Sequence, residues 1–397
     1  MSTTLTPTVM DVSALAERTT AAVNNDGETS APRPLAAARW DWSGVRRVLV
    51  VRLRSIGDTV LATPSLFALR RFLPQARIDL LLEDWVAPLL DGSPDVDHII
   101  TIKRRDTASR LTVVRQLRAT RYDVAFNLHG GSTAALLMRA SGARHRVGYA
   151  GYRYQRLHNH AAPPASQLWQ RDQTHSAEQQ LALLGWTGVP VSDRPMAQLV
   201  VTADADARVA RRLRDIRLDA RLDGGQDFAL IHPAAAFDSK TWAAENFARV
   251  AEYLSVRGLA SIIVAAPGEE RVVDALRNYT RVPVVAFTDL TLPEVTALAA
   301  RARLFVGNDS GIAHIAAAVR TPSVIIFGSS NVAHWRPWTN APAEVVREEM
   351  TCAPCPGYTC AEFDVPQCIR RIPVERVTDA VARVLEESVG RRLDEQP

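Results

Sequence analysis

Strand-like runs of aliphatic and β-branched residues alternate with helix-like segments along most of this chain, in two successive series. Strands that alternate with helices form parallel sheets buried on both faces. The sequence therefore predicts an α/β protein with two doubly wound, Rossmann-like domains. The strand-like runs lie at residues 46–53, 77–83, 96–102, 123–130 and 145–151, and then at 227–233, 260–267, 284–288, 303–309 and 322–328.

The same pattern sets the expected domain limits. Residues 1–43 are rich in Thr, Ala, Pro and Ser without sustained periodicity, which predicts a disordered N-terminal tail. We expect one Rossmann-like domain at 44–195 and a second at 196–373, the latter with a Cys-rich loop at 351–369. Residues 374–397 are expected to form a C-terminal helix and tail.

Composition and charge exclude several classes of protein. The 397 residues are 47% hydrophobic and 23% charged, which fits a soluble globular protein, and the net charge of +4 does not require a nucleic-acid partner. No apolar run approaches the roughly 18 residues of a membrane span, and the N-terminus lacks a secretory pattern, so a cytoplasmic protein is expected. The first strand is not followed by G-x-G-x-x-G, which argues against a nicotinamide-dependent oxidoreductase.

Ligands of open α/β sheets bind outside the carboxyl ends of the strands, so the residues after each strand are candidates for a site. Gly57 and Asp58 follow the first strand in "RSIGDTV". Gly57 lets another group approach the backbone closely. Asp58 is either a helix cap or a group that does chemistry.

The second series carries its own candidates. Lys240, in the loop of "FDSKTW", could neutralise a phosphate or be a solvated side chain. In "GNDSGIAH" the backbone N–H groups of Ser310 and Gly311 open a helix where a pyrophosphate could bind. Asp309 suits sugar hydroxyls, and His314 lies one turn beyond Ser310. The alternative is a capped helix with a buried histidine.

All four cysteines fall near the end of the chain, with the spacing C-x2-C-x4-C-x7-C. Four thiolates at short spacing suit a structural zinc or iron–sulfur site, and free or paired thiols are an equal alternative. In either case the segment is interpreted as a loop stabiliser, distinct from an active centre. The four residues are Cys352, Cys355, Cys360 and Cys368.

Five stretches in this order resemble the ADP-heptose:lipopolysaccharide heptosyltransferases, which are inverting glycosyltransferases of the GT-B fold. They are "VLVVRLRSIGDTVLATPSLFALRRFLP", "DVAFNLHG" with "GARHRVGY", "HPAAAFDSKTWAAENFARVAEYL", "FVGNDSGIAHIAAAVRTPSVIIFG" and the cysteine segment. The resemblance runs from about residue 47 to residue 385. It implies two domains that face each other across a cleft, with the acceptor on the N-terminal domain and the nucleotide sugar on the C-terminal one. It also implies a C-terminal helix that packs back toward the N-terminal domain.

The resemblance assigns roles residue by residue. Asp58 matches the proposed catalytic base, with Gly57 leaving room beside it, and Lys240 matches a contact to the donor diphosphate. Glu270, or its neighbour Glu269, matches a contact to the nucleoside. The residues that match the donor-holding turn are Asp309, Ser310, Gly311 and His314. Some relatives carry hydroxyl residues where this chain has Ala235 and Ala236.

The implied activity is the transfer of a heptose or related sugar from an ADP-sugar to a lipopolysaccharide-core or other glycan acceptor, with inversion and without a metal or other cofactor. The alternatives are a different nucleotide-sugar donor and a non-catalytic nucleotide-sugar-binding protein. The expected partners are the donor and a glycolipid or glycan, without nucleic acid. A monomer is expected, with peripheral contact to the inner membrane. Basic residues could meet acceptor phosphates or form a solvated basic face; they are Arg52, Arg54, Arg70 and Arg71.

Overall fold

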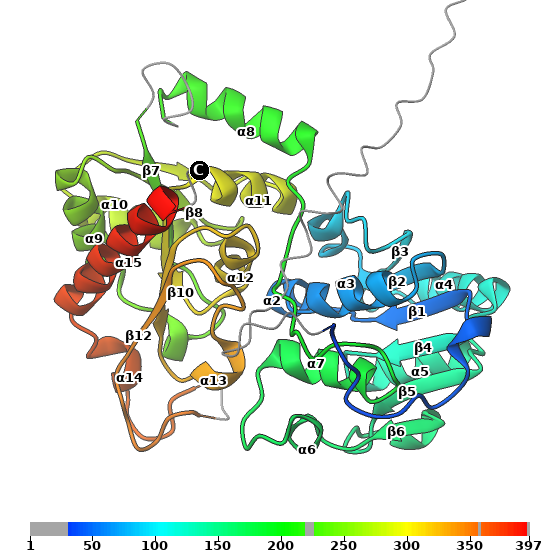
Figure 1. The fold of residues 1–397 in the computed structure, drawn as a ribbon. Coiled ribbons are helices and arrows are strands. Elements are labelled where there is room, and N and C mark those ends of the chain that lie inside the picture. The colour runs from blue at the N-terminus through cyan, green and yellow to red at the C-terminus, as the bar shows by residue number, and fades with distance from the viewer. Residues whose placement is uncertain (1–30, 219–225, 356–358, 395–397) are drawn as a thin grey trace, which may run out of the picture.

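The computed structural model describes residues 31–218, 226–355 and 359–394, and each of its two domains is built on a six-stranded sheet (Figure 1). In the N-terminal sheet all strands are parallel, in the order β3-β2-β1-β4-β5-β6. Its strands are β1 (Arg47–Val51), β2 (Arg77–Glu83), β3 (His98–Ile102), β4 (Val124–Asn127), β5 (His145–Tyr149) and β6 (His160–Ala162). Its helices are η1 (Trp42–Gly44), α2 (Ile56–Val60), α3 (Thr63–Phe72), η2 (Ala87–Leu90), α4 (Thr107–Thr120), α5 (Ser132–Ala140), η3 (Gln155–Leu157), α6 (Ala165–Trp169) and α7 (Ser176–Gly185).

The C-terminal sheet repeats this topology, with the order β12-β11-β10-β7-β8-β9 and parallel pairing throughout. The predicted pair of doubly wound domains is therefore confirmed. The strands are β7 (Phe228–His232), β8 (Ala260–Val264), β9 (Val284–Phe287), β10 (Leu304–Asn308), β11 (Ser323–Phe327) and β12 (Ala343–Arg347). The helices are α8 (Ala203–Asp215), η4 (Asp238–Lys240), α9 (Ala244–Val256), α10 (Glu270–Tyr279), α11 (Leu292–Arg301), α12 (Gly311–Ala318), α13 (Val332–Trp335), α14 (Gln367–Arg370) and α15 (Val374–Asp394).

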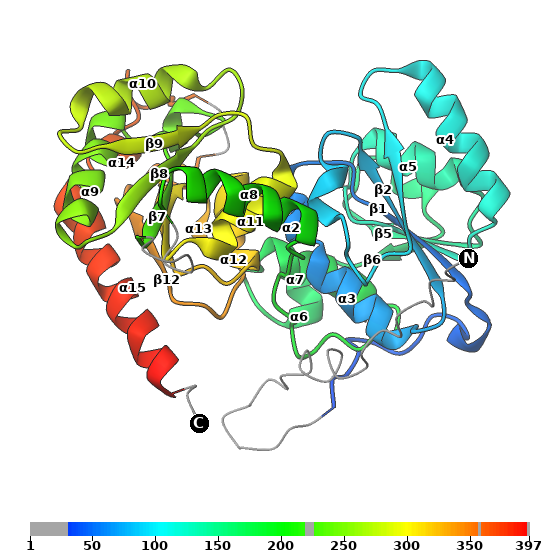
Figure 2. The ribbon, with the colours of Figure 1, turned by 90° about the horizontal axis from the view of Figure 1, so that it is seen from above.

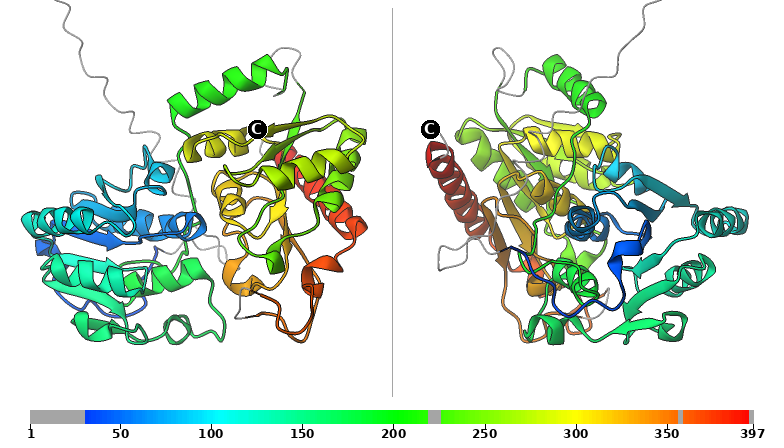
Figure 3. Two further views of the ribbon diagram at one scale, coloured as in Figure 1. Left: turned by 180° about the vertical axis from the view of Figure 1, so that it is seen from behind. Right: turned by 45° about the vertical axis from the view of Figure 1, so that its right-hand side comes forward.

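The C-terminal helix does not pack toward the N-terminal domain, so that expectation is wrong. α15 lies against β11, β12 and α9, on the side of the C-terminal domain away from the N-terminal one (Figures 1 and 3). Its apolar stripe includes Val377, Val381 and Val384, which are buried in the core cluster of the second domain. Burial of a stripe at helical spacing requires an apolar sheet face, and the nearest one is that of its own domain.

The described part of the predicted tail, residues 31–43, is also ordered on the N-terminal domain, contrary to the expected disorder. The backbone N–H groups of Leu35 and Ala36 both donate to the carbonyl oxygen of Gly185, at 3.0 and 3.2 Å. Trp42 is buried, and its indole N–H donates to Thr187 O at 2.9 Å. Aromatic burial with a satisfied N–H fixes the segment, and composition alone did not reveal it. Residues 1–30, the rest of that prediction, lie outside the described residues.

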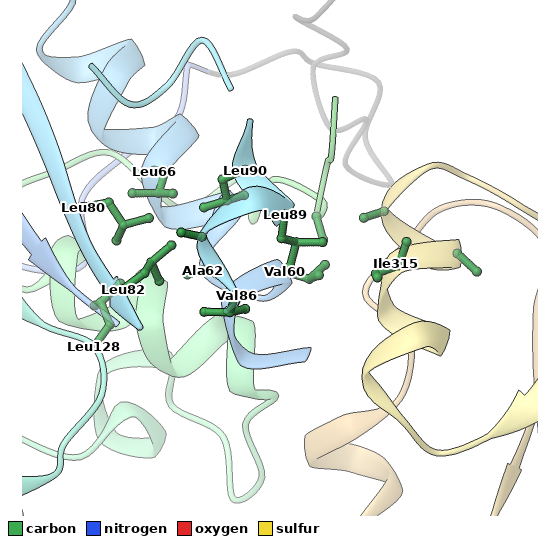
Figure 4. Packing of buried hydrophobic residues seen from close by; sticks show 14 of the residues in the cluster. Val60, Ala62, Leu66, Leu80, Leu82, Val86, Leu89, Leu90, Leu128 and Ile315 are labelled. Atoms are coloured by element: carbon green, nitrogen blue, oxygen red, sulfur yellow. The ribbon is translucent and has the colours of Figure 1, made fainter. Parts of the chain in front are cut away.

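The two domains meet through α2 and α12, which follow the first and the fourth strand of their sheets along the chain. Apolar side chains close this contact: Val60 of α2 and Leu89 of η2 face Ile315 of α12 (Figure 4). Seen from above, α2 lies between the two sheets (Figure 2). The carboxyl edges of the two sheets therefore face the same interface, where ligands of such sheets bind.

His175 makes a second, polar link between the domains. Its Nδ1 accepts from Ala177 N at 3.1 Å at the start of α7, and its Nε2 lies 2.8 Å from the carbonyl oxygen of Arg336. Nε2 therefore carries the proton, because a carbonyl can only accept. The ring stacks on Trp338 with 4.6 Å between ring centroids. Burial lowers the pKa of His175 to about 3, so the neutral ring is the folded form.

We expect acid to weaken the fold through this histidine. Its pKa in the unfolded chain, near 6.5, is above the folded value of about 3, so the unfolded state binds the extra proton as pH falls below 6.5. The free energy of unfolding should then drop by up to about 1.4 kcal/mol per pH unit for this one group. Urea unfolding at pH 7.5, 6.5 and 5.5 measures the slope. His175→Gln should be less stable at pH 7.5 and show a shallower slope; an equal slope would contradict the assignment.

Candidate active site

Asp58 lies in the first turn of α2, directly after the central strand β1 of the N-terminal sheet. Its Oδ2 accepts from the backbone N–H and the hydroxyl of Ser55, at 3.3 and 3.1 Å. This is a capping box, in which the acidic residue three positions inside the helix satisfies the cap residue. Asp58 therefore does cap the helix, as one of the two interpretations expected. The cap uses only Oδ2 and leaves Oδ1 for other partners.

Arg52 is the partner of Oδ1, and sequence reasoning placed it wrongly among solvated or acceptor-facing cations. Only 8% of Arg52 is exposed. Its guanidinium forms an ion pair with Asp58 and donates to the carbonyl oxygen of Leu128 after β4. Arg52 therefore fixes the carboxylate at the edge of the sheet. Arg70 and Arg71 pair with Asp97 and Asp193, so they serve the fold of the domain.

Across the interface, Lys240 and Asp309 form a partly buried ion pair. Lys240 Nζ lies 2.8 Å from Asp309 Oδ2, and 23% of the lysine side chain and 6% of the aspartate side chain are exposed. The hydroxyl of Ser330, in the loop after β11, donates to the same oxygen. The pair places one cation at the carboxyl edge of the second sheet, in reach of an anionic ligand.

A glycine that the sequence did not single out holds Lys240 in place. A Cβ added at Gly328 would lie 2.0 Å from the carbonyl oxygen of Ser239, the residue before Lys240. The neighbouring Ser329 donates from its backbone N–H to the same carbonyl at 3.1 Å and from its hydroxyl to Ser239 Oγ at 2.8 Å. η4 is thus clamped on the end of β11, 90 residues away in sequence.

Gly328→Ala is expected to displace η4 and to lower the free energy of unfolding by roughly 2–3 kcal/mol, because the added methyl group meets backbone. Nucleotide binding should weaken with it, since Lys240 moves. Gly390→Ala in α15 is the matched control: no atom lies within 4 Å of its added Cβ, and the change should stabilise by about 0.5–1 kcal/mol. Urea titrations and ADP binding by calorimetry measure both. Wild-type values for Gly328→Ala would contradict the clamp.

His314 brings the two halves of the site together. A Cβ added at Gly57 would lie 2.7 Å from His314 Cδ2, so only glycine permits this contact between α2 and α12. Gly311 has the same role toward Ile56, at 2.7 Å. His314 is 5% exposed, and burial lowers its pKa, while the charges of Asp309 and Asp58 raise it. The neutral imidazole thus lies within electrostatic reach of carboxylates from both domains.

Two buried polar atoms at this contact have no protein partner among the described residues. They are the hydroxyl oxygen of Ser310, the N-cap residue of α12, and Nδ1 of His314. A buried polar group without a partner costs free energy, and such groups concentrate where a ligand completes them. The sequence-predicted donor residues Asp309, Ser310, Gly311 and His314 therefore share one place with Lys240 and Asp58.

Glu270 is not brought to this group. It is exposed at the start of α10, and its carboxylate accepts from the backbone N–H of Gly268 at 3.0 Å, which lowers its pKa. Glu269 is half-buried instead, accepts from Ala266 N at 2.7 Å, and its charge acts on the buried His232 at the end of β7. A nucleoside contact at this edge of the sheet stays a prediction for both glutamates.

A pocket of about 200 Å³ opens on the N-terminal domain, between the segments that follow β1, β3 and β4. We call it the basic pocket: it is lined by Arg54, Lys103, Arg104, Arg105, Arg110 and His129, and Glu83 is the one acid among the lining residues. Burial lowers the pKa of His129 to about 4, and the nearby charge of Arg52 adds to this shift, while that of Asp58 opposes it. The pocket is thus strongly cationic, and His129 in its lining lies within electrostatic reach of Asp58.

The four cysteines carry free thiols. Burial raises the pKa of Cys368, and the other three thiols add to the shift, so the four lie near one another. No group of three or more His, Cys, Asp or Glu side chains is arranged to hold a metal in the described parts of the chain. Residues 356–358, between Cys355 and Cys360, lie outside the described residues, and both interpretations of this segment stay predictions.

Comparison with known proteins agrees with the fold and the motifs. The sequence model of glycosyltransferase family 9 (heptosyltransferase) matches residues 110–365. Lipopolysaccharide heptosyltransferase 3 of Escherichia coli K12 is 30% identical over 304 residues, which cover 72% of this chain and 84% of that protein. The glycosyltransferase family 9 structure from Veillonella parvula (TM-score 0.75, 20% identity) covers 86% of this chain and 98% of its own. The structure of E. coli ADP-heptose lps heptosyltransferase II has a TM-score of 0.71 and 21% sequence identity. The match covers 86% of this chain and 99% of that one.

Two Rossmann-like domains that meet at the carboxyl edges of their parallel sheets form the GT-B fold, which this chain shares with these structures. The chain belongs to glycosyltransferase family 9, the heptosyltransferases. The family and fold expected from the sequence are thus confirmed. The roles of the individual site residues stay predictions.

Proposed function

We propose that this enzyme transfers a heptose from ADP-heptose to a sugar of a lipopolysaccharide-core acceptor, with inversion at the anomeric carbon and Asp58 as the general base. The observation that carries the proposal is the placement of the Asp58 carboxylate directly across the α2–α12 contact from Lys240, Ser310 and His314. Donor and acceptor class are taken from the relatives, whose names specify lipopolysaccharide and, in one case, ADP-heptose.

The chemistry follows from the positions of these groups. The acceptor hydroxyl attacks the anomeric carbon of the donor and gives its proton to a carboxylate oxygen of Asp58. The bond from that carbon to the diphosphate breaks, and the electron pair leaves with ADP. Lys240 and the N–H groups at the start of α12 stabilise the charge that grows on the diphosphate. Arg52 and Ser55 hold the base in one orientation, which limits its reorganisation during the reaction.

We assign the acceptor to the N-terminal domain, which carries Asp58. The basic pocket includes His129, whose pKa the charge of Asp58 affects, and its lining holds five Lys or Arg side chains and one acid. Phosphates or carboxylates on an acceptor sugar would be held there by charge-assisted hydrogen bonds. We also expect ADP to bind without a metal, since Lys240 and the N–H groups at the start of α12 supply positive charge for the diphosphate.

The test is a direct assay of transfer. The purified protein is incubated with ADP-heptose and with lipopolysaccharide from a strain that lacks this gene. ADP release is followed, and the anomeric configuration of the product is read by NMR. We expect transfer with inverted configuration and much lower rates with UDP- and GDP-sugars. ADP binding without any transfer would favour the non-catalytic alternative. Transfer from another nucleotide sugar alone would overturn the donor assignment.

A further inference from the structure

The outer face of the N-terminal domain carries exposed leucines among arginines. α4 and α5 pack side by side on one face of the sheet, and Arg118 of α4 donates to the carbonyl oxygen of Ala140, at the end of α5. The inner sides of both helices are buried, for example at Val113 and Leu117. We define the α4–α5 face as the residues at helical spacing on the opposite side: Leu111, Arg115 and Arg118 of α4, and Leu136 and Arg139 of α5.

Both leucines of this face are unusually exposed for their type, Leu111 at 61% and Leu136 at 56%. Trp85, whose indole N–H donates to Glu83 of the basic pocket at 2.8 Å, is 47% exposed. Large apolar side chains exposed beside arginines are typical of surfaces that insert shallowly at a lipid headgroup boundary.

The cations of α4, α5 and the loop before α4 have no carboxylate partners in the described parts of the chain. α4 and α5 contain four arginines and no acidic residue, and the loop before α4 adds three more cations in "KRR". Among the described residues, none of these side chains forms an ion pair with an acid. α8 shows the contrast, since its Arg208 and Arg212 pair with Glu294 and Asp289. Unpaired charge of one sign keeps its full field available to an anionic surface.

The α4–α5 face adjoins the basic pocket. Lys103 and Arg104 lie in the loop that leads into α4, and they line the pocket together with Arg110 in the first turn of that helix. Figure 2 shows α4 at the outer edge of the N-terminal domain, away from the C-terminal domain. No helix in the described ranges is long and apolar enough to cross a membrane.

We propose that the α4–α5 face docks on an anionic phospholipid bilayer, with the three arginines at the headgroups and Leu111 and Leu136 at the acyl boundary. The role of this docking rests on the proposed function: it would bring the sugar of a lipid-anchored acceptor to the basic pocket. The docking itself does not depend on that function. The arginines of the face are complementary in charge to anionic lipid headgroups. A bilayer would also remove both leucines from water, whereas a soluble glycan would leave them exposed to it.

The test measures binding of the whole protein to vesicles without donor or acceptor, so that it does not depend on activity. Vesicles of phosphatidylcholine with about 30% phosphatidylglycerol are compared with phosphatidylcholine alone by flotation. We expect binding only to the anionic vesicles and release in about 0.5 M NaCl, where charge is screened within a few ångströms. Arg115→Glu/Arg139→Glu should lower the partition coefficient by at least about 25-fold, at roughly fivefold for each cation lost.

Arg211→Glu/Arg214→Glu on α8 is the matched control, because these two exposed arginines also lack acidic partners among the described residues and the change in net charge is the same. Its vesicle binding should stay close to wild type. No hydrogen bond to another described residue is formed by the side chain of Arg115 or of Arg139, and thermal unfolding of both variants verifies the fold. Equal losses in the two variants, or binding retained in Arg115→Glu/Arg139→Glu, would overturn the proposal.

An activity arm separates lipid from glycan recognition. With the acceptor embedded in anionic vesicles, transfer by Arg115→Glu/Arg139→Glu should fall in parallel with binding. With a deacylated, water-soluble acceptor its rate should match wild type. A loss with the soluble acceptor would instead assign the face to the glycan and overturn membrane docking. Absence of transfer by the wild-type protein would count against the proposed function, while the vesicle result would still stand.

Discussion

Asp58→Asn is expected to lower kcat by about 10²- to 10⁴-fold, the range that a positioned general base contributes. The amide keeps the size of the carboxylate but cannot take a proton from the acceptor hydroxyl. Donor affinity should change little, because Lys240 and the start of α12 are untouched. Steady-state kinetics with ADP-heptose, together with calorimetric titration of ADP, separate the two effects. A variant that retains more than about a tenth of kcat would exclude Asp58 as the base.

The substitution also has a structural cost, which needs a matched control. Asp58 completes a capping box with Ser55 and pairs with the buried Arg52. Glu294 has the same position in α11, where it accepts from Thr291 and pairs with Arg208. Glu294→Gln should therefore lose a comparable 1 kcal/mol or so of stability and keep its kcat. If both variants lose activity in proportion to stability, the role of Asp58 is only structural.

Lys240→Met is expected to reduce kcat/KM for the donor by roughly 10- to 150-fold, the equivalent of about 1.5–3 kcal/mol for a hydrogen bond to a charged group. The loss should be seen in kcat as well as in KM, because charge on the leaving diphosphate grows during the reaction. ADP binding should weaken in parallel. Wild-type kinetics in this variant would show that Lys240 serves only its ion pair with Asp309.

The same variant leaves Asp309 buried without its cation, so stability should fall too. Lys240→Met/Asp309→Asn removes both charges and is the control for that effect. We expect the double variant to regain most of the stability lost by Lys240→Met and none of the donor affinity. Urea unfolding and ADP calorimetry on the three proteins measure the coupling. Recovery of ADP binding in the double variant would contradict a direct phosphate contact.

The alternation of strands and helices determined the two domains, because burial on both faces of a parallel sheet imposes its pattern on every local run. The motifs after β1 and β10 likewise predicted where Asp58 and the Ser310–Gly311 turn would lie. Each is a short-range signal: a strand end followed by a residue type suited to a helix start. For that reason the family and the position of the interface could be inferred without coordinates.

Only the tertiary structure decided which neighbours these residues have. The sequence does not distinguish Arg52 from the many surface arginines, yet its side chain is buried. It contacts Asp58 and the carbonyl oxygen of Leu128, which lies 76 residues further along the chain. Gly328 permits the close approach of the Lys240 turn to the end of β11. α15 packs on the sheet of its own domain and not on that of the N-terminal domain. The α4–α5 face exists because two helices align their exposed sides. Such contacts depend on how distant segments pack, and packing leaves no periodic trace in the sequence.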